Sequence, residues 1–456
     1  MRCDFLANII SQTRRLNRAH RSGTLGGIVM QGRFNIFQRS MLLWDGMHPY
    51  NAVHVVRVSA ACDAARLRQT LARALEERGL TGLRMDAKGR AFEFRGGPAV
   101  IELAVISGDD PADALRAEME RQINVRFDSS GEFTPFRFFA VPEGGSFWLG
   151  VAYFHVIADA EPIVRLACEL AADCAAMGAP VKRERWDCHA VPSAPWRPLL
   201  WLRKLLALPA QFRAMRNAIR PGGTDGDDFG NGVELFTLGG GELELLIAAG
   251  KKIGVTVNDL FLALLMRSLA PLCEAVRRPG RDGISLGCIV NARRDLDIAG
   301  DDGFGLVLGG FSITCGIAET AGISPLARSI AAQTRRYKRG GFYLANMLEM
   351  GLVLRLMSLF STNRRRRFYP KNYPLWGGLT NMNLKKLPLA PAAAQPLDYL
   401  RTVSTGPVTP LVLSVTTFGK GVNLAMSYRT SVFSRSEISA VRDRFVAAVR
   451  GLEAAA

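Results

Sequence analysis

The chain repeats one order of predicted strands and helices twice, and a stretch without periodicity separates the two copies. Apolar or alternating runs predict the strands, and apolar residues spaced by three or four predict the helices. In the first half we expect strands at 52–59, 91–95, 100–106, 136–141 and 146–154 and helices at 63–78, 111–124 and 161–177. In the second half we expect strands at 232–238, 284–290, 306–314, 411–418 and 421–428 and helices at 242–251, 258–276, 325–348 and 434–450.

The interval between the copies is rich in Pro, Arg and Trp and ends in a Gly/Asp tract at 221–228, a composition typical of a linker. A chain of 456 residues is also too long for a single hydrophobic core. We therefore predict an α+β protein with an N-terminal lobe at 1–178, a basic linker at 179–231 and a C-terminal lobe at 232–456. Each lobe should contain a mixed sheet packed with helices.

Cysteine and histidine spacing argues against a metal site. The 8 cysteines are scattered without a CxxC pair, and only 5 histidines are present. Reduced cysteines of a cytoplasmic protein explain this pattern. The N-terminus lacks the order of a secretory signal, and the longest apolar stretch, Met350 to Phe360, is interrupted by Arg355. We expect a soluble or peripheral protein.

The net charge of +17 points to an anionic partner. Basic and apolar residues alternate in two stretches, 196–220 and 351–371, as in helices that lie at a membrane interface. Solvated surface helices explain either stretch alone equally well. The two together favour a membrane surface, on the inner face of the membrane, or a phosphate-bearing substrate. Nucleic acid is disfavoured because no nucleic-acid-binding module accompanies the charge.

His155 is the histidine whose setting most favours chemistry. An apolar strand, 149–154, leads into it, and Asp159 follows four residues later. A strand end presents a reactive side chain on a rigid support. A carboxylate at this spacing could fix the turn by accepting backbone N–H groups or an arginine. On spacing alone, however, a histidine beside apolar residues is more often structural.

The segment Phe154-His155-Val156-Ile157-Ala158-Asp159-Ala160 resembles the HHxxxDG motif of condensation domains, shared as HxxxD by the wider chloramphenicol-acetyltransferase-like acyltransferase superfamily. Weaker matches follow in the family's order. They are 49–51, 63–78, an RHxxLR-like element at 78–84, 127–128, 134–137, 257–260, 289–293, 304–305 and 380–381. The resemblance therefore runs from about residue 48 to the C-terminus. It includes wax-ester and complex-lipid acyltransferases, but no DFGWG motif of the plant relatives is present.

The resemblance implies two chloramphenicol-acetyltransferase-like lobes with a tunnel between them and His155 at its centre. It implies acyl transfer from a thioester, on coenzyme A or an acyl carrier protein, to a hydroxyl or amine, with His155 as the general base and no permanently bound cofactor or metal. It makes Asp159 a structural support, paired with Arg78 as first candidate or Arg293 as second. It also places Asn381 near the tunnel. The basic, apolar stretches make a lipid-like acceptor plausible.

Two positions depart from the family motif. Phe154 replaces the first His, although the family uses the second His as base. Ala160 replaces Gly, and a positive φ there would cost on the order of 1 kcal/mol. A second hypothesis is therefore a degenerate member that binds a carrier protein or an acyl ligand without catalysis.

Overall fold

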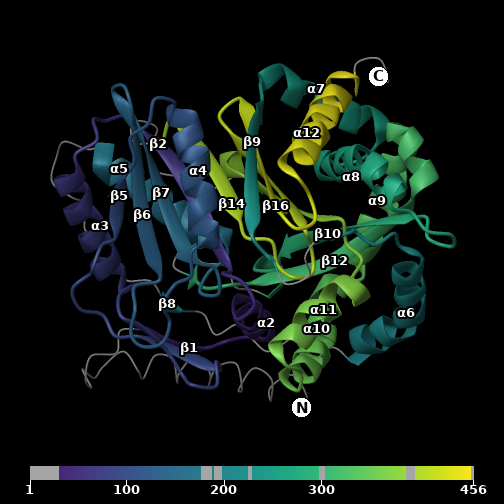
Figure 1. The fold of residues 1–456 in the computed structure, drawn as a ribbon, viewed down its shortest axis with the longest axis horizontal. Helices are drawn as coiled ribbons and strands as arrows, with labels where there is room; N and C mark the ends of the chain where they lie inside the picture. Colours follow the sequence, from purple (N-terminus) through teal and green to yellow (C-terminus); the bar gives the residue numbers. More distant parts are fainter. Residues whose placement is uncertain are drawn as a thin grey trace, which may run out of the picture.

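The computed structural model describes residues 30–175, 187–188, 198–223, 228–296, 303–386 and 396–452. In this part of the chain, two β-sheets with helices packed on them form two lobes that lie side by side (Figure 1). The α+β class and the two-lobe arrangement expected from the sequence are confirmed. Most predicted elements lie within two or three residues of their observed bounds.

The N-terminal lobe is built on a five-stranded sheet with the order β14-β2-β7-β6-β5. Its strands are β2 (Asn51–Val58), β5 (Leu103–Val105), β6 (Phe136–Glu143), β7 (Ser146–Phe154) and β14 (Asp398–Val403). Helices α3 (Ala64–Arg78) and α5 (Ala160–Ala175) pack together on one face, and α4 (Pro111–Asn124) packs on the other. A small sheet with the order β1-β4-β3 adds β1 (Met30–Arg33), β3 (Leu83–Met85) and β4 (Ala91–Phe94).

The alternation of side chains along β2 explains why both faces of this sheet are covered. Val56 and Val58 belong to the core beneath α3 and α5, whereas Val53 and Val55 belong to the core beneath α4. Successive strand residues point to opposite faces, so a mostly apolar strand requires a packed layer on each side. The even-numbered face of β2 continues toward the site described below.

The C-terminal lobe contains a six-stranded sheet with the order β12-β10-β13-β15-β16-β9. Its strands are β9 (Asn231–Leu238), β10 (Gly283–Asn291), β12 (Leu308–Gly316), β13 (Gly377–Asn383), β15 (Leu411–Phe418) and β16 (Gly421–Arg429). Helices α7 (Gly240–Ile253), α8 (Val257–Ala275), α9 (Ile323–Arg339) and α12 (Arg435–Arg450) pack against it. The capping box formed by Thr256 and Asp259 starts α8, whose apolar residues are buried on nearly all sides.

The structure differs from the sequence prediction in how the lobes divide the chain. β14 lies within the range assigned to the C-terminal lobe, yet it pairs with β2 and completes the N-terminal sheet. The predicted linker, 179–231, contains helix α6 (Pro198–Asn217) and the short strand β8 (Asp187–Cys188), which pairs with β11 (Gly303–Phe304). The linker residues 179–186, 189–197 and 224–227 lie outside the described residues, and these include the start of the basic stretch 196–220.

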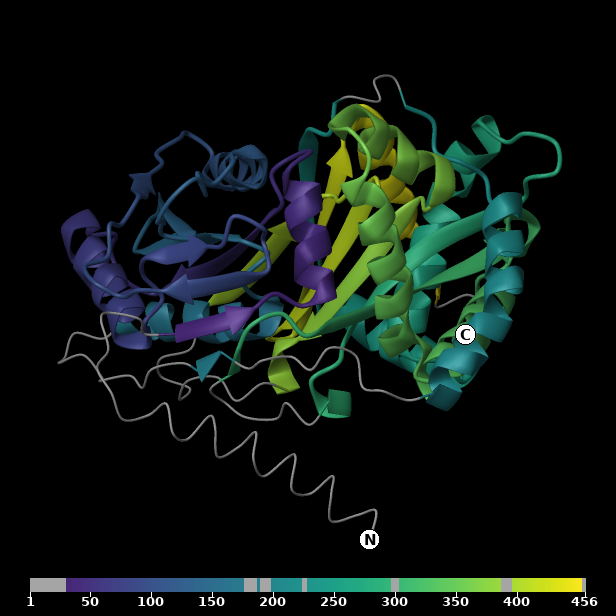
Figure 2. The same ribbon diagram turned by 90° about the horizontal axis from the view of Figure 1, so that it is seen from below.

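The predicted helix at 325–348 is two helices, α9 and α10 (Phe342–Ser358). Gly341 between them adopts φ +62, a left-handed conformation that ends a helix and suits glycine. Helix α2 (Ile36–Asp45) was missed, and the basic stretch 351–371, expected as one surface helix, is the end of α10 followed by a separate helix, α11 (Thr362–Asn372). Figure 2 shows α2, in purple, standing between the lobes beside the light-green α10, with which it is in contact.

No single helix among the described residues is both long and apolar enough to cross a bilayer. The bent pair α7 and α8 meets that criterion only when the two helices are taken together, with an angle of 102° between them.

Candidate active site at the lobe interface

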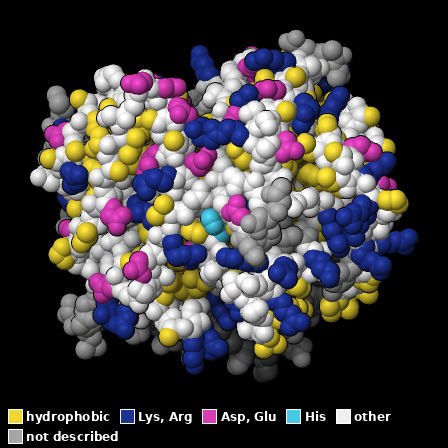
Figure 3. All heavy atoms as spheres, viewed as in Figure 1, with side chains coloured by type: hydrophobic (Ala, Val, Ile, Leu, Met, Phe, Trp, Pro, Cys, Tyr) yellow, Lys and Arg dark blue, Asp and Glu magenta, His cyan; other side chains and the backbone are white. Residues whose placement is uncertain are grey.

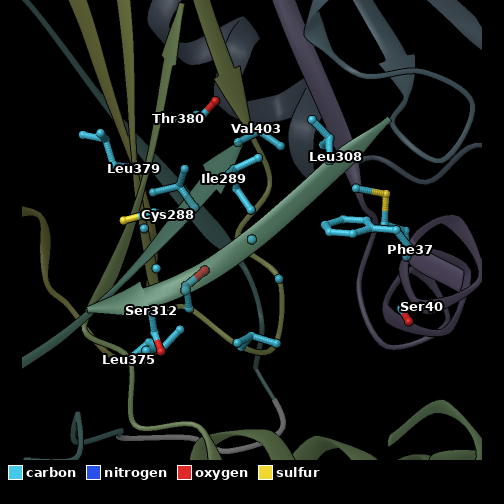
Figure 4. Close-up of a pocket in the computed structure, with 18 of the residues that line it drawn as sticks. Phe37, Ser40, Cys288, Ile289, Leu308, Ser312, Leu375, Leu379, Thr380 and Val403 are labelled. Carbon is cyan, nitrogen blue, oxygen red and sulfur yellow. The ribbon is translucent and has the colours of Figure 1, made fainter. Parts of the chain in front are cut away.

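A cavity of about 380 Å³ lies where the two lobes meet. Strands β2, β7 and β14 of the N-terminal sheet and β10, β12 and β13 of the C-terminal sheet line it, together with helices α2, α10 and α11. In Figure 4, Phe37 and Ser40 of α2 lie on one side of the cavity and Leu379 and Thr380 of β13 lie on the other, with β12 running between them. Most of the lining side chains are apolar. Such a site favours a largely apolar ligand held by a few polar groups.

His155 follows the last residue of β7 and lines this cavity. Its backbone N–H donates to the Tyr50 carbonyl at 3.2 Å, which fixes the turn to β2. The ring stacks on Tyr50, with centroids 5.6 Å apart and an interplanar angle of 8°, and meets Tyr153 edge-on at 5.6 Å. The two tyrosines therefore hold the imidazole in one orientation.

The protonation of His155 is set by its own turn. Its Nδ1 lies 2.9 Å from the Ala158 carbonyl, which can only accept, so Nδ1 carries the hydrogen. Nε2 is then the basic nitrogen of the neutral ring. Burial lowers the pKa of His155 below its usual 6.5, and this exceeds the opposing effects of the Ala158 hydrogen bond and of Asp159. The imidazole is therefore a neutral base at pH 7.

Asp159 is buried and holds the turn against the other lobe. Its carboxylate pairs with Arg293, which follows β10, and accepts the Val307 N–H at 2.9 Å and the Glu161 N–H at 3.1 Å. The Glu161 contact places the carboxylate at the N-terminus of α5, where negative charge is favoured. These contacts join the two lobes within four residues of His155.

Gly305 forms hydrogen bonds with both Asp159 and Arg293. Its carbonyl accepts the Asp159 N–H at 3.1 Å and an Arg293 guanidinium N–H at 3.0 Å. Its φ of +146 lies in a region that other residues rarely adopt. Arg293, the second candidate, is thus the partner of Asp159. Arg78, the first candidate, is fully buried in α3, where it pairs with Glu169 of α5 and donates to the Ala74 carbonyl.

The two departures from the motif have little effect on the local geometry. Phe154 points away from the cavity and packs against Phe127 and Phe133, because neighbouring residues on β7 face opposite sides. Ala160 is the first residue of α5 and adopts a helical conformation. A positive φ is therefore not required at this position, and the strain considered for Ala160 does not arise.

Asn381 does not line the cavity. Its side chain is exposed and donates to Asn258 at 3.4 Å, while Thr380, one residue earlier on β13, lines the cavity instead. The assignment of Asn381 to the site is wrong by one residue, and a one-residue shift on a strand reverses the face.

The sequence did not predict a group of buried polar residues around His54, on the face of β2 that carries the even-numbered residues. His54 Nδ1 and the Tyr399 hydroxyl share a hydrogen bond of 2.5 Å, and the His54 ring meets both Tyr399 and Tyr153 edge-on. Burial lowers the pKa of His54 well below 6.5, and the charge of Arg401 lowers it further. Arg401 lies opposite His54 on β14 and lines the cavity. The alternation His54, Val56, Val58 was a usable signal, but β14 itself was not predicted.

Helix α2 was also missed, although it forms one wall of the cavity through Phe37, Met41 and Trp44. Asn35 and Gln38 form a capping box at its start, with hydrogen bonds of 2.9 and 3.0 Å. That pattern before an apolar stretch is a helix signal readable in the sequence.

No protein-family model matches the chain, and no curated protein matches its sequence. Several solved structures do match its fold. One is the trichothecene 15-O-acetyltransferase of Fusarium sporotrichioides, with a TM-score of 0.67 and 12% identity over 94% of this chain and 97% of that one. Another is the first condensation domain of the calcium-dependent antibiotic synthetase, with a TM-score of 0.62 and 15% identity over 93% and 97%.

A third is the starter condensation domain of rhizomide synthetase, solved in complex with C8-CoA and Leu-SNAC, with a TM-score of 0.61 and 13% identity over 93% of this chain and 95% of that one. All three align over nearly their whole length, so the likeness covers both lobes and the interface between them. At these identities the likeness establishes the fold. The chain has the two-lobed fold of the condensation-domain and chloramphenicol-acetyltransferase-like acyltransferases.

Proposed function

We propose that the protein is an acyltransferase, with acyl-CoA or an acyl carrier protein as donor and a hydroxyl or amine as acceptor. The observation that carries the proposal is the hydrogen bond from His155 Nδ1–H to the Ala158 carbonyl, which leaves Nε2 as a neutral base in the interlobe cavity. A thioester donor is also suggested by the rhizomide synthetase domain, which was solved with C8-CoA and Leu-SNAC.

In the proposed reaction, Nε2 of His155 takes the proton of the acceptor O–H or N–H while the acceptor atom attacks the thioester carbonyl. A new C–O or C–N bond forms and the carbonyl oxygen becomes an oxyanion. When this intermediate collapses, the C–S bond breaks and the imidazolium returns its proton to the thiolate. Asp159 and Arg293 keep the turn that carries His155 in place, so they act as positioning residues.

A lipid-like substrate is the substrate class that the cavity favours. Apolar and aromatic side chains of α2, α10 and α11 form its wall, among them Met41, Val353 and Tyr369. Helix α10 and its C-cap residue also expose Leu352, Leu356 and Leu359, which fall on one helix face. The neighbouring helix α6 exposes Leu202, Leu205 and Leu206.

Basic residues flank these exposed leucines on α6, α10 and α11, including Arg213, Arg355 and Arg364. Figure 3 shows Lys and Arg side chains next to hydrophobic ones in the lower right part of the surface, where Figure 1 places these helices. We propose that this face contacts an anionic membrane, so that α10 would separate the bilayer from the cavity. Apolar burial and attraction to anionic lipid would both contribute.

Flotation with vesicles tests the membrane contact. Vesicles of phosphatidylcholine with phosphatidylserine should carry the protein, and vesicles of phosphatidylcholine alone should carry much less. The triple variant Leu352→Ser, Leu356→Ser, Leu359→Ser should lose flotation, whereas Leu397→Ser, at another exposed leucine, should not. If the triple variant floats as well as Leu397→Ser and the unaltered protein, this face does not contact the membrane.

The alternative function is binding of a carrier protein or an acyl ligand without catalysis. Acyl-CoA donors of graded chain length, each mixed with a panel of alcohols and amines, separate the two functions through release of free thiol. Release that depends on the acceptor supports acyl transfer. Acyl-CoA binding without thiol release would support the binding-only function and contradict the transferase.

A further inference from the structure

Arg401 is a buried cation whose protein partners are all neutral. Its guanidinium donates to Thr416 Oγ1 at 3.0 Å, to Thr380 Oγ1 at 3.2 Å, and to the carbonyl oxygens of Thr380 at 2.8 Å and Val415 at 2.9 Å. The residue is 6% exposed and lines the cavity. It extends from β14 of the N-terminal sheet to β13 and β15 of the C-terminal sheet.

The charge of Arg401 has no counter-charge among the described residues. No described carboxylate forms an ion pair with it. Two acids line the cavity: Asp159 is paired with Arg293, and Glu349 of α10 accepts a hydrogen bond from the Tyr373 hydroxyl at 3.4 Å. Tyr153 and Tyr399 remain neutral phenols because burial raises the pKa of each well above 10. Burial lowers the pKa of Arg401 to about 10, so the guanidinium is still charged at pH 7.

Burying a charged group without an opposite charge costs several kcal/mol. A ligand with a negative charge in the cavity would offset this cost. Four of the five guanidinium N–H groups are occupied by the bonds above, which leaves one N–H and the charge for a ligand. One donor suits a carboxylate oxygen, whereas a phosphate needs several donors to replace its hydration.

We propose that the molecule bound in this cavity carries a carboxylate, and that Arg401 binds it. The inference rests on the proposed function for the identity of the cavity as a substrate site, and it adds the chemical class of that substrate: an apolar molecule with a carboxylate. Arg401 lies opposite His54, four residues along β2 from Tyr50, on which His155 stacks. Arg401 also lies close enough to His155 for its charge to lower the pKa of that histidine.

Calorimetric titration of the full chain with decanoate and with 1-decanol tests the proposal without any turnover. Both probes have the same chain length, and only one carries the charge. The protein should bind decanoate at least tenfold more tightly than 1-decanol. Arg401→Met should remove that preference while 1-decanol binding and the melting temperature of the 1-decanol complex persist. Arg84→Met, at an exposed arginine of β3, is the matched control and should keep the preference.

Three results would overturn the proposal. One is equal binding of the two probes by the unaltered protein, a result that needs no variant to fold. Another is an unchanged preference for decanoate in Arg401→Met. The third is an equal loss of kcat by Arg401→Met for carboxylate and neutral acceptors without any change in KM, which would assign Arg401 to the oxyanion instead. Thiol release without a preference for decanoate contradicts only this inference, and a preference without thiol release contradicts only the proposed reaction.

Discussion

Two buried arginines cross the interface between the lobes, and they do so in opposite electrostatic states. Arg293 extends from the C-terminal lobe to Asp159, and its charge is neutralised by that carboxylate. Arg401 extends from β14 to neutral oxygens of β13 and β15, and no described carboxylate offsets its charge. Arg293 therefore forms an ion pair within the protein. Arg401 leaves an uncompensated positive charge at the cavity.

This difference indicates that the charge of Arg293 has a structural role, whereas the charge of Arg401 is available to a ligand. Asp159 with Arg293 fixes the turn that presents His155, and both carboxylate oxygens of Asp159 and both terminal nitrogens of Arg293 have protein partners. Arg401 also joins the lobes, but its remaining charge disfavours protonation of His54 and His155. Substitution of Arg293 and of Arg401 should therefore destabilise the protein to different extents.

Asp159→Ala should have the largest effect on stability, about 3–5 kcal/mol, because it leaves the buried Arg293 without its counter-charge. Urea unfolding measures the loss. The double variant Asp159→Leu, Arg293→Met should recover a large part of it, since the uncompensated charge is gone. A loss under about 1 kcal/mol for Asp159→Ala would mean that the pair is not a structural lock.

Arg401→Met should destabilise less, by about 1–3 kcal/mol, because it removes hydrogen bonds to neutral oxygens but also removes a desolvated charge. Arg293→Met, which leaves Asp159 unpaired, is the matched comparison and should cost about 3–5 kcal/mol. Equal losses in the same urea experiment would show that the charge of Arg401 is compensated, and would end the distinction between the two arginines.

Stability should fall as the pH drops below 6.5. Burial lowers the pKa of His54 in the folded state, so the unfolded chain binds a proton that the folded chain does not. The sign of linkage then gives a loss of about 1.4 kcal/mol per pH unit for this histidine, beginning near its unfolded pKa of about 6.5. Urea midpoints between pH 7.5 and pH 5.5 measure the slope. Burial also lowers the pKa of His155 and of His48, so His54→Phe should reduce the slope without abolishing it. An unchanged slope in that variant would assign the effect to the other histidines.

Ala160→Gly should have the smallest effect. Ala160 is helical at the start of α5, so glycine, the residue found in the family motif, should lower stability by about 1 kcal/mol or less and leave activity unchanged. Thermal melting and thiol release measure both. An increase in activity of tenfold or more would mean that Ala160 distorts the turn after all.

The sequence predicted the fold well because its signals are local. Helix α4 was predicted with its observed bounds, since Asp110 and Pro111 mark its start, and the strands predicted at 136–141 and 146–154 are the two strands of the β6–β7 hairpin. His155 and Asp159 were found because a motif keeps them four residues apart. The Arg293 contact was one of two candidates, and only the packing of the lobes selects between them.

The remainder of the site depends on contacts distant in sequence. β14 pairs with β2 over more than 340 residues, and no local pattern predicts that Arg401 lies opposite His54. Asn381 was assigned to the cavity in place of Thr380, because a resemblance locates a strand more readily than its register. Tyr50 and Tyr153 were part of recognised stretches, but their stacking on His155 follows from the pairing of β2 with β7.

The rate of thiol release by His155→Ala shows whether Nε2 of His155 is the catalytic base. The measurement uses the acyl-CoA and acceptor pair that gives the fastest release with the unaltered protein, and thermal melting confirms that the variant is folded. We expect kcat/KM to fall by about 10²–10⁴-fold with little change in melting temperature, because Nε2 is the base that activates the acceptor. Unchanged kcat/KM in the folded variant would contradict it.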